Sequence, residues 1–426
     1  MKKLSLILII VFWAGFTYSQ NLLEMYKSGK IQLVVDDEFA QNVNWDIVFE
    51  SWHDTSVGRW VGDRKSLMVA PDGSVIVSHH FRDFYTVFTP QGDFNKELQV
   101  KDHRGRIIRK LPHFHGVLDG NIYYTGLDNM GNLRCFDKDG NLIKTLHLDY
   151  GARQIIPLPN RKLGVMGWVL WRESVREFVA IVDYETNEEK IIWDRFKPMA
   201  FMPGTPRDMF EYAYEFKERG MVSFSSMPFT GSSSRRHPLT ISNIGNKIIL
   251  TIPETGDIKI FDLKGNLVSE QTIDWAKNYL SVDEQKEIQR RAIERYRNIA
   301  EPQFAAWVSA EENRAARDYF VREMEIDLAR INKPIPMPVF SAVFQDSDDN
   351  LLFFEFPEEE GANKFNVWIY HEGGQFIAQS SLVAEDINLE IKPSKMVFHN
   401  GYIYALVVKE GVEGVPLRLM RFKLKN

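Results

Sequence analysis

A turn signal that recurs between short apolar runs is the feature that most constrains the fold of this chain. Asp-Gly or Asn-Gly pairs, or close substitutes, separate paired apolar segments six times. Because Asp-Gly and Asn-Gly tolerate the positive φ of a tight hairpin, each turn predicts two antiparallel strands. The six turns fall at residues 71–74, 118–121, 159–161, 244–247, 347–350 and 399–401.

A second turn follows the first in most of these units. The sequences Phe-Asp-Lys-Asp-Gly-Asn at 136–141 and Phe-Asp-Leu-Lys-Gly-Asn at 261–266 are near-copies of each other. Residues 88–93 form a third copy, and 182–187 and 370–374 form looser ones. Each unit therefore predicts strand, turn, strand, loop, strand, turn and strand, which is one four-stranded antiparallel blade.

Six such units predict an all-β fold, a six-bladed β-propeller with a helical-hairpin insertion, because closing the ring leaves only short protected edges. The length of 426 residues fits one body, since each repeat packs on its neighbour. The last unit has no obvious fourth strand, and the apolar segment 30–35 is predicted to complete it and close the ring. The blades are predicted at about 64–100, 111–148, 153–194, 238–274, 339–383 and 394–424.

The Phe-Asp-x-x-Gly-Asn strand ends and the Asp-Gly hairpins resemble those of NHL-like six-bladed β-propeller proteins, of the secreted type common in Bacteroidota. The resemblance covers about residues 30–426, apart from two insertions. It implies the fold and no particular activity, because this architecture carries enzymes, receptors and scaffolds alike.

The first nineteen residues have the pattern of a secretory signal peptide. Lys2 and Lys3 precede an apolar run at 4–16, and Thr17-Tyr18-Ser19 predicts cleavage before Gln20. A membrane anchor is the alternative, but an apolar run of about 13 residues is short for a span. The mature part, 20–426, is therefore predicted to be exported to the periplasm or cell surface, with no transmembrane segment after cleavage.

Charge and cysteine content exclude some classes of protein. The formal net charge of −6 gives no basic face, so no nucleic-acid partner is expected. Cys135 is the single cysteine, so no internal disulfide can form. A lone cysteine in an apolar strand is expected to be a small buried residue.

Two segments, at about 195–236 and 275–334, do not fit the repeat. The second contains two capping-box patterns, at 281–284 and 309–312, each followed by apolar residues at helical spacing, which predicts a helical hairpin. Both insertions fall in connections between blades, and these share a face with the loops that join second and third strands. Insertions gathered on one face are typical of a binding face. The alternative is that they cap the ring without contacting a ligand.

Aromatic, basic and imidazole side chains gather in the loops of that face. Six of the ten histidines fall there, at positions 79, 80, 103, 113, 115 and 237. The predicted ligand-binding residues are His79, His80, Arg82, His113, His115, Arg153, Trp168, Trp171, Arg172, Arg235 and His237.

Three interpretations of these residues remain open. Imidazoles from several blades could converge on a metal, which would activate water in a hydrolase or lyase. Tryptophan, arginine and histidine could instead bind a sugar or peptide by stacking and hydrogen bonding. They could also be unrelated loop residues. No His-Glu-x-x-His, Gly-x-Ser-x-Gly or phosphate-loop motif occurs, so catalytic residues and cofactors stay unknown. The sequence favours a recognition module of the cell envelope with a glycan, peptide or envelope-protein partner.

Overall fold

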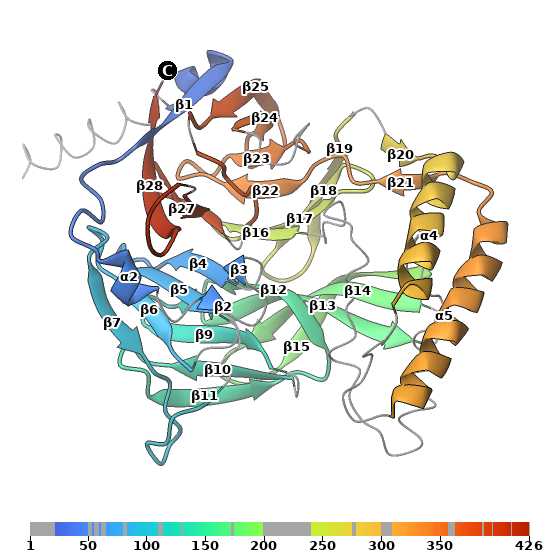
Figure 1. The fold of residues 1–426 in the computed structure, drawn as a ribbon. Coiled ribbons are helices and arrows are strands. Elements are labelled where there is room, and N and C mark those ends of the chain that lie inside the picture. The colour runs from blue at the N-terminus through green and yellow to red at the C-terminus, as the bar shows by residue number, and fades with distance from the viewer. Residues whose placement is uncertain are drawn as a thin grey trace, which may run out of the picture.

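The computed structural model shows a mostly β protein whose antiparallel sheets are arranged like the blades of a propeller (Figure 1). The signal peptide predicted for 1–19 lies outside the described residues, and so does most of the insertion predicted at 195–236. The described residues are 22–49, 53–54, 59–60, 65–79, 83–109, 114–128, 131–171, 174–198, 240–274, 278–299, 309–356, 363–385, 387–393, 395–409 and 411–425.

Within the described ranges, four sheets have four strands each, antiparallel and in chain order. Sheet one contains β4 (Lys65–Val69), β5 (Val75–His79), β6 (Tyr85–Phe88) and β7 (Phe94–Leu98). Sheet two contains β8 (Phe114–Leu118), β9 (Ile122–Leu127), β10 (Asn132–Phe136) and β11 (Leu142–His147). Sheet three contains β12 (Gly151–Leu158), β13 (Lys162–Trp171), β14 (Ser174–Asp183) and β15 (Glu189–Pro198). Sheet four contains β16 (Thr240–Ile244), β17 (Lys247–Ile252), β18 (Asp257–Asp262) and β19 (Leu267–Thr272).

The remaining long strands form one eight-stranded sheet with two halves. Sheet five is the half with β22 (Ala342–Gln345), β23 (Leu351–Phe354), β24 (Lys364–Tyr370) and β25 (Phe376–Val383). Sheet six is the half with β26 (Met396–His399), β27 (Tyr402–Val408), β28 (Leu417–Lys425) and β1 (Lys30–Val35). Strand β1 joins the halves, because it pairs antiparallel with β28 and parallel with β25.

The Asp-x-x-Gly-Asn sequences form a turn that is held by hydrogen bonds from backbone N–H groups to the Asp side chain. At 137–141, the Asp137 carboxylate accepts backbone N–H groups from Asp139 and Asn141, both at 2.9 Å. The Asn141 amide donates to the second carboxylate oxygen, also at 2.9 Å. Gly140 has a φ of 84°, which explains the glycine. The same hydrogen bonds occur at Asp262, so the repeated motif is a repeated turn.

Apolar clusters lie between consecutive sheets and hold them face to face. Tyr85 of sheet one packs with Phe114 and Phe136 of sheet two, for example. Other clusters join sheets two and three, three and four, four and five, and five and six. A further cluster packs Leu67 of sheet one with Leu406 of sheet six. Sheet six therefore packs against sheet one, just as each other sheet packs against the next one in the chain.

Lysines on outer strands add polar links between neighbouring sheets. Each one extends from its own sheet and donates to a backbone carbonyl in the third-to-fourth-strand turn of the next sheet. The pairs are Lys96 with Lys138 O at 3.0 Å, Lys144 with Glu185 O at 2.9 Å, and Lys190 with Lys264 O at 2.5 Å.

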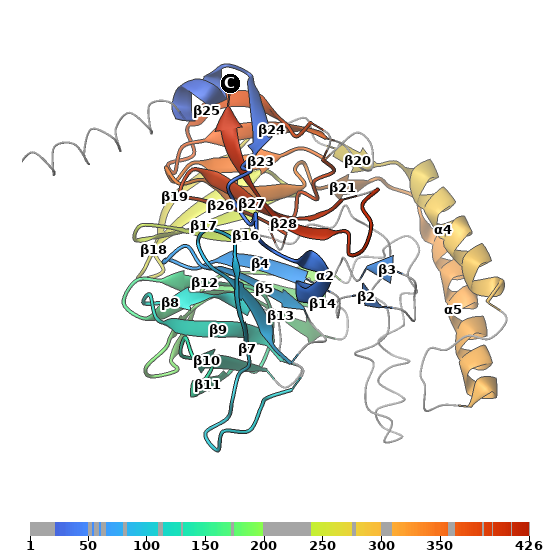
Figure 2. The same cartoon turned by 60° about the vertical axis from the view of Figure 1, so that its left-hand side comes forward.

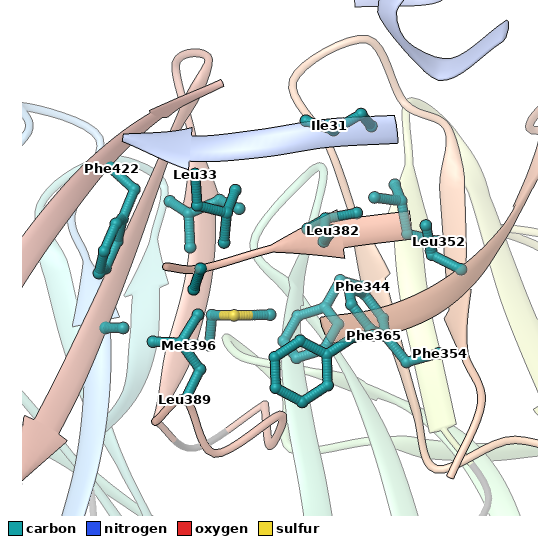
Figure 3. Packing of buried hydrophobic residues seen from close by; sticks show 14 of the residues in the cluster. Ile31, Leu33, Phe344, Leu352, Phe354, Phe365, Leu382, Leu389, Met396 and Phe422 are labelled. Atoms are coloured by element: carbon teal, nitrogen blue, oxygen red, sulfur yellow. The ribbon is translucent and has the colours of Figure 1, made fainter. Parts of the chain in front are cut away.

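Strand β1 completes the last half of the eight-stranded sheet with buried apolar side chains. Ile31 is fully buried and Leu33 is 5% exposed. Figure 3 shows β1 above β25, with Ile31 and Leu33 beside Leu382 and Phe422. One short segment from the N-terminal part of the chain thus pairs with the edge strands of both halves and packs apolar side chains against both.

Two helices occupy the segment between sheets four and five. Helix α4 (Val282–Arg297) begins with a capping box, in which Ser281 and Glu284 each accept the other's backbone N–H. Helix α5 (Ala310–Arg330) begins directly after the second predicted cap and packs on α4 through Ile293 and Met324. Figure 2 shows the pair standing beside the body of sheets. Short elements in the connections are α2 (Trp45–Val48), β2 (His53–Asp54), β3 (Arg59–Trp60), β20 (Asn278–Leu280) and β21 (Ile335–Met337).

A buried ion cluster joins the end of β1 to β28. Asp36 is 3% exposed, and Arg421 donates to one of its carboxylate oxygens at 2.6 and 2.7 Å. Lys423 lies 2.7 Å from the other oxygen. Burial by itself opposes ionisation, but hydrogen bonds from Lys423 and Arg421 outweigh it and hold the pKa of Asp36 below its usual 3.8.

We expect Asp36 to contribute to stability in a pH-dependent way. Because its pKa is lower in the folded state, the contribution is present above pH 3.8 and is lost as pH falls through the folded pKa. Asp36→Asn should therefore cost more stability at about pH 7 than at about pH 2.5. Urea unfolding of both proteins at the two pH values tests this. An equal difference at both would show that the Asp36 charge does not stabilise the fold.

Gly92 lies where the segment after β1 crosses a turn of sheet one. Its φ is 90°, and a Cβ there would lie 2.7 Å from both the Ala40 nitrogen and the Phe39 ring. Gly92→Ala is therefore expected to lower the free energy of unfolding by about 3 kcal/mol. Gly105 is the matched control, because its φ is 74° but a Cβ would meet nothing within 4 Å. Gly105→Ala should cost about 1 kcal/mol, and equal losses in thermal unfolding would contradict the steric argument.

Candidate functional site

Sheet three has long strands, and three of them extend toward the second-to-third-strand loop. Strands β13, β14 and β15 have ten residues each. The ladder continues up to the pair of Ser174 with Pro198. The sequence places the end of this blade at 194 and an insertion from 195, so the boundary lies four residues too early. The reason is that residues 195–198 pair with the extended β14, which hairpin signals alone do not locate.

A row of paired residues crosses all four strands of this extension. Gly151 pairs with Trp168, Trp168 with Glu177, and Glu177 with Arg195. Directly paired residues project from the same face of a sheet. A Cβ at Gly151 would lie 2.5 Å from Cε2 of Trp168, so the glycine leaves space for the indole to lie against the first strand. The row thus places an aromatic, a carboxylate and a guanidinium side chain on one face of the sheet.

Glu177 is the buried centre of a chain of alternating charges. Its side chain is 6% exposed, and its two oxygens accept from different arginines. Arg153 Nη1 lies 2.6 Å from Oε1, and Arg195 Nη2 lies 2.7 Å from Oε2. Arg195 also contacts Glu254 of sheet four at 3.2 Å. The contacts follow the order Arg153, Glu177, Arg195 and Glu254, so the charges alternate in sign from Arg153 onward.

Strand bulges bring two predicted site residues to the first strands of neighbouring sheets. The register of β12 against β13 skips Arg153, and the register of β8 against β9 skips His115. The strands β8 and β12 lie in contact with each other. A bulge leaves one residue out of the ladder and turns its side chain, and bulges are frequent next to functional sites. Among the described residues, the Arg153 guanidinium has a single partner, Glu177, and is 38% exposed.

A second charged and aromatic group lies on the other face of the extension. Arg176 lies 2.7 Å from Asp194 across the ladder. Its guanidinium also lies 5.8 Å from the ring centre of Phe196, which is 62% exposed. Sequence reasoning did not identify these residues, nor Glu177, Arg195 and Glu254. The signal available for Glu177 was a charged Arg176-Glu177 pair inside an otherwise mostly apolar strand.

The structure describes only part of the predicted ligand-binding set. Arg153 binds Glu177, Trp168 is the cross-strand partner of Glu177, and His115 lies in the adjacent first strand. His79 ends β5 and Trp171 ends β13, but their side chains lie outside the described part. The remaining predicted residues lie entirely outside it: His80, Arg82, His113, Arg172, Arg235 and His237.

His103 does not lie where the sequence suggested. It is exposed in a turn at 102–106, and Lys101 before it pairs with Asn141. Asn141 belongs to the turn after β10, at the opposite end of that strand from the second-to-third-strand loop. The expectation that six histidines share one face is therefore wrong for His103. The physical reason is that the chain after β7 runs along the next sheet before it enters β8.

The metal hypothesis stays a prediction, because most of its histidines lie outside the described residues. Inside them, no three His, Cys, Asp or Glu side chains form a group suited to a metal. Cys135 is buried, as expected, and burial raises the pKa of its thiol to about 12. It therefore stays a protonated thiol at neutral pH. None of the helices within the described ranges is long and apolar enough to span a membrane.

Comparison with known proteins gives structural likeness only. No protein-family model and no curated protein matches the chain. A member of the DUF4221 family from Bacteroides vulgatus is similar in structure, with TM-score 0.47, 11% identity, and coverage of 94% of this chain and 100% of that one. A putative exported protein from Bacteroides fragilis has TM-score 0.41 and 9% identity, covering 85% and 90%. BamB from Moraxella catarrhalis has TM-score 0.33 and 9% identity, covering 84% and 82%.

Proposed function

We propose that the chain is an exported six-bladed β-propeller that recognises a ligand of the cell envelope. The blade count is supported by the apolar clusters between consecutive sheets, including the one between sheets six and one. Export is supported by the signal-peptide pattern at 1–19. The ligand classes that fit are a glycan, a peptide or an envelope protein.

The observation that carries the proposal is that Arg153 and Trp168 both project from the face of sheet three that holds the buried Glu177 carboxylate. Glu177 fixes the Arg153 guanidinium, and the pairing of Trp168 with Gly151 and Glu177 puts the indole on the same face of the sheet. Both side chains keep part of their surface exposed. Arginine and tryptophan are enriched in binding sites because each offers a rigid contact surface with polar edges. The lengthened strands present this surface at the loop end of sheet three.

Binding arrays of envelope glycans and peptides, probed with the mature protein, test the recognition role. Every ligand found is then titrated against the triple variant Arg153→Gln, Trp168→Ala and Trp171→Ala. We expect its affinity to fall by at least tenfold. The matched control combines Arg161→Gln with Phe376→Ala, which removes an exposed arginine and an exposed aromatic ring near turns elsewhere. Unchanged affinity in the triple variant would refute the proposed site.

Cell fractionation tests the export proposal. The full chain is expressed in a Gram-negative host, and the protein from each fraction is sequenced from its N-terminus. We expect a periplasmic or surface protein that begins at Gln20. A protein retained in the cytoplasm with Met1 intact would contradict export.

A further inference from the structure

The charged side chains linked to Arg153 differ in how far they are exposed to solvent. The four members of the Glu177 chain alternate in sign, and its two ends differ in exposure. Arg153 forms the positive end at 38% side-chain exposure, whereas Glu254 forms the negative end at 17%. Arg195, in the middle, contacts carboxylates on both sides. Among the described residues, Glu177 alone binds the Arg153 guanidinium, so Arg153 is the half-exposed cation of this group with donors that no described residue engages.

The remaining N–H donors of Arg153 lie in a fixed plane. A guanidinium has five N–H donors in a planar fork that matches a carboxylate. Glu177 engages one nitrogen, Nη1, and so holds the plane while other donors stay available. The bulge at Arg153 releases this residue from the ladder with β13. A second carboxylate can thus bind without displacing the first.

The indole of Trp168 supplies the second half of the surface. Trp168 is the direct cross-strand partner of Glu177, so its side chain projects from the same face of the sheet as the carboxylate that binds Arg153. A flat aromatic ring stacks against the flat C–H face of a pyranose and leaves the ring hydroxyls free for water or polar partners. A carboxylate on that pyranose would then meet the guanidinium.

Resting on the recognition role proposed above, we infer that the ligand at Arg153 and Trp168 is an acidic saccharide. Its uronic-acid carboxylate accepts a forked hydrogen bond from Arg153, and its sugar ring stacks on Trp168. Charge-assisted forked bonds are about twice as strong as neutral hydrogen bonds. The carboxylate should therefore contribute about tenfold or more in affinity over the neutral sugar.

The test compares three small probes with the mature protein by ligand-observed NMR and calorimetry. They are methyl β-glucuronide, methyl β-glucoside, and an acetylated dipeptide with a free carboxylate. We expect the glucuronide to bind at least about tenfold more tightly than the glucoside, less tightly as salt rises. Arg153→Gln should remove this preference, and Trp168→Ala should weaken both sugars. Arg161→Gln is the control for loss of an exposed arginine.

Several results would overturn the inference. They are equal binding of the two sugars, tighter binding of the dipeptide, no binding of any probe, or a preference that survives Arg153→Gln. Melting temperatures of the variants separate loss of binding from loss of folding. If the arrays instead yield a neutral ligand that depends on Trp168, the recognition role stands and the acidic-saccharide inference fails. If every ligand ignores the triple variant, both fail.

Discussion

The double replacement Ile31→Ala and Leu33→Ala is expected to lower the free energy of unfolding by about 5 kcal/mol, the largest effect we predict. Each side chain is at most 5% exposed and packs among residues of sheets five and six. Truncating one buried Ile or Leu costs about 2–5 kcal/mol, from lost apolar burial and the cavity left behind. The two residues lie close together, so their effects need not add fully.

The double replacement should disturb more of the fold than truncation of a core residue elsewhere does. Strand β1 is the fourth strand of sheet six and also pairs with β25, so its loss exposes the edges of β25 and β28 together. Urea unfolding followed by circular dichroism measures the change. Ile143→Ala is the control, because Ile143 is 46% exposed on the outer strand β11. A loss of less than about 2 kcal/mol in the double variant would show that β1 is dispensable.

Replacing Arg421 with glutamine is expected to lower the free energy of unfolding by about 3 kcal/mol. Asp36 has 1% side-chain exposure, so removing its main partner leaves a buried charge with Lys423 alone. Removal of one member of a buried ion pair costs about 3–5 kcal/mol. The lower end applies here because Lys423 remains and is 41% exposed.

Arg421 also makes contacts that a smaller side chain cannot replace. Its guanidinium lies 4.7 Å from the ring centre of Phe39 and 4.6 Å from that of Tyr402. It donates to the Pro90 carbonyl at 3.1 Å and so links sheet six to a turn of sheet one. The predicted loss therefore affects the junction between the last and first sheets.

An exposed arginine with two carboxylate partners is the control for this prediction. Arg161 contacts Asp119 at 2.9 Å and Glu185 at 2.7 Å, with all three side chains about half exposed. Solvent screens such pairs, so Arg161→Gln should leave the free energy of unfolding almost unchanged. Thermal unfolding of both variants at low and high salt makes the comparison. Equal losses would mean that burial does not set the strength of the Asp36 cluster.

The candidate site was only partly accessible from the sequence. Arg153 and Trp168 were selected from predicted loops and connections, yet both lie on strands, whereas His115 lies on a strand as its alternation with His113 predicted. Arg153 and His115 each lie at a β-bulge. A bulge shifts the strand register by one residue, and the amino-acid composition of a segment does not reveal such a shift. Glu177 was missed because its partners are 24 and 18 residues away in sequence. Only the strand order β12, β13, β14, β15 in the folded sheet brings them together.

The sequence by itself determined the local structure of this protein. The turns at 137–141 and 262–266 follow from contacts within five residues, where an aspartate accepts backbone N–H groups and a glycine takes a positive φ. Tertiary structure alone decided the parallel pairing of β1 with β25, the pairing of Asp36 with Arg421, and the charge chain at Glu177. These contacts join segments that are distant in sequence. They stabilise the fold only after neighbouring sheets have packed together and excluded water from them.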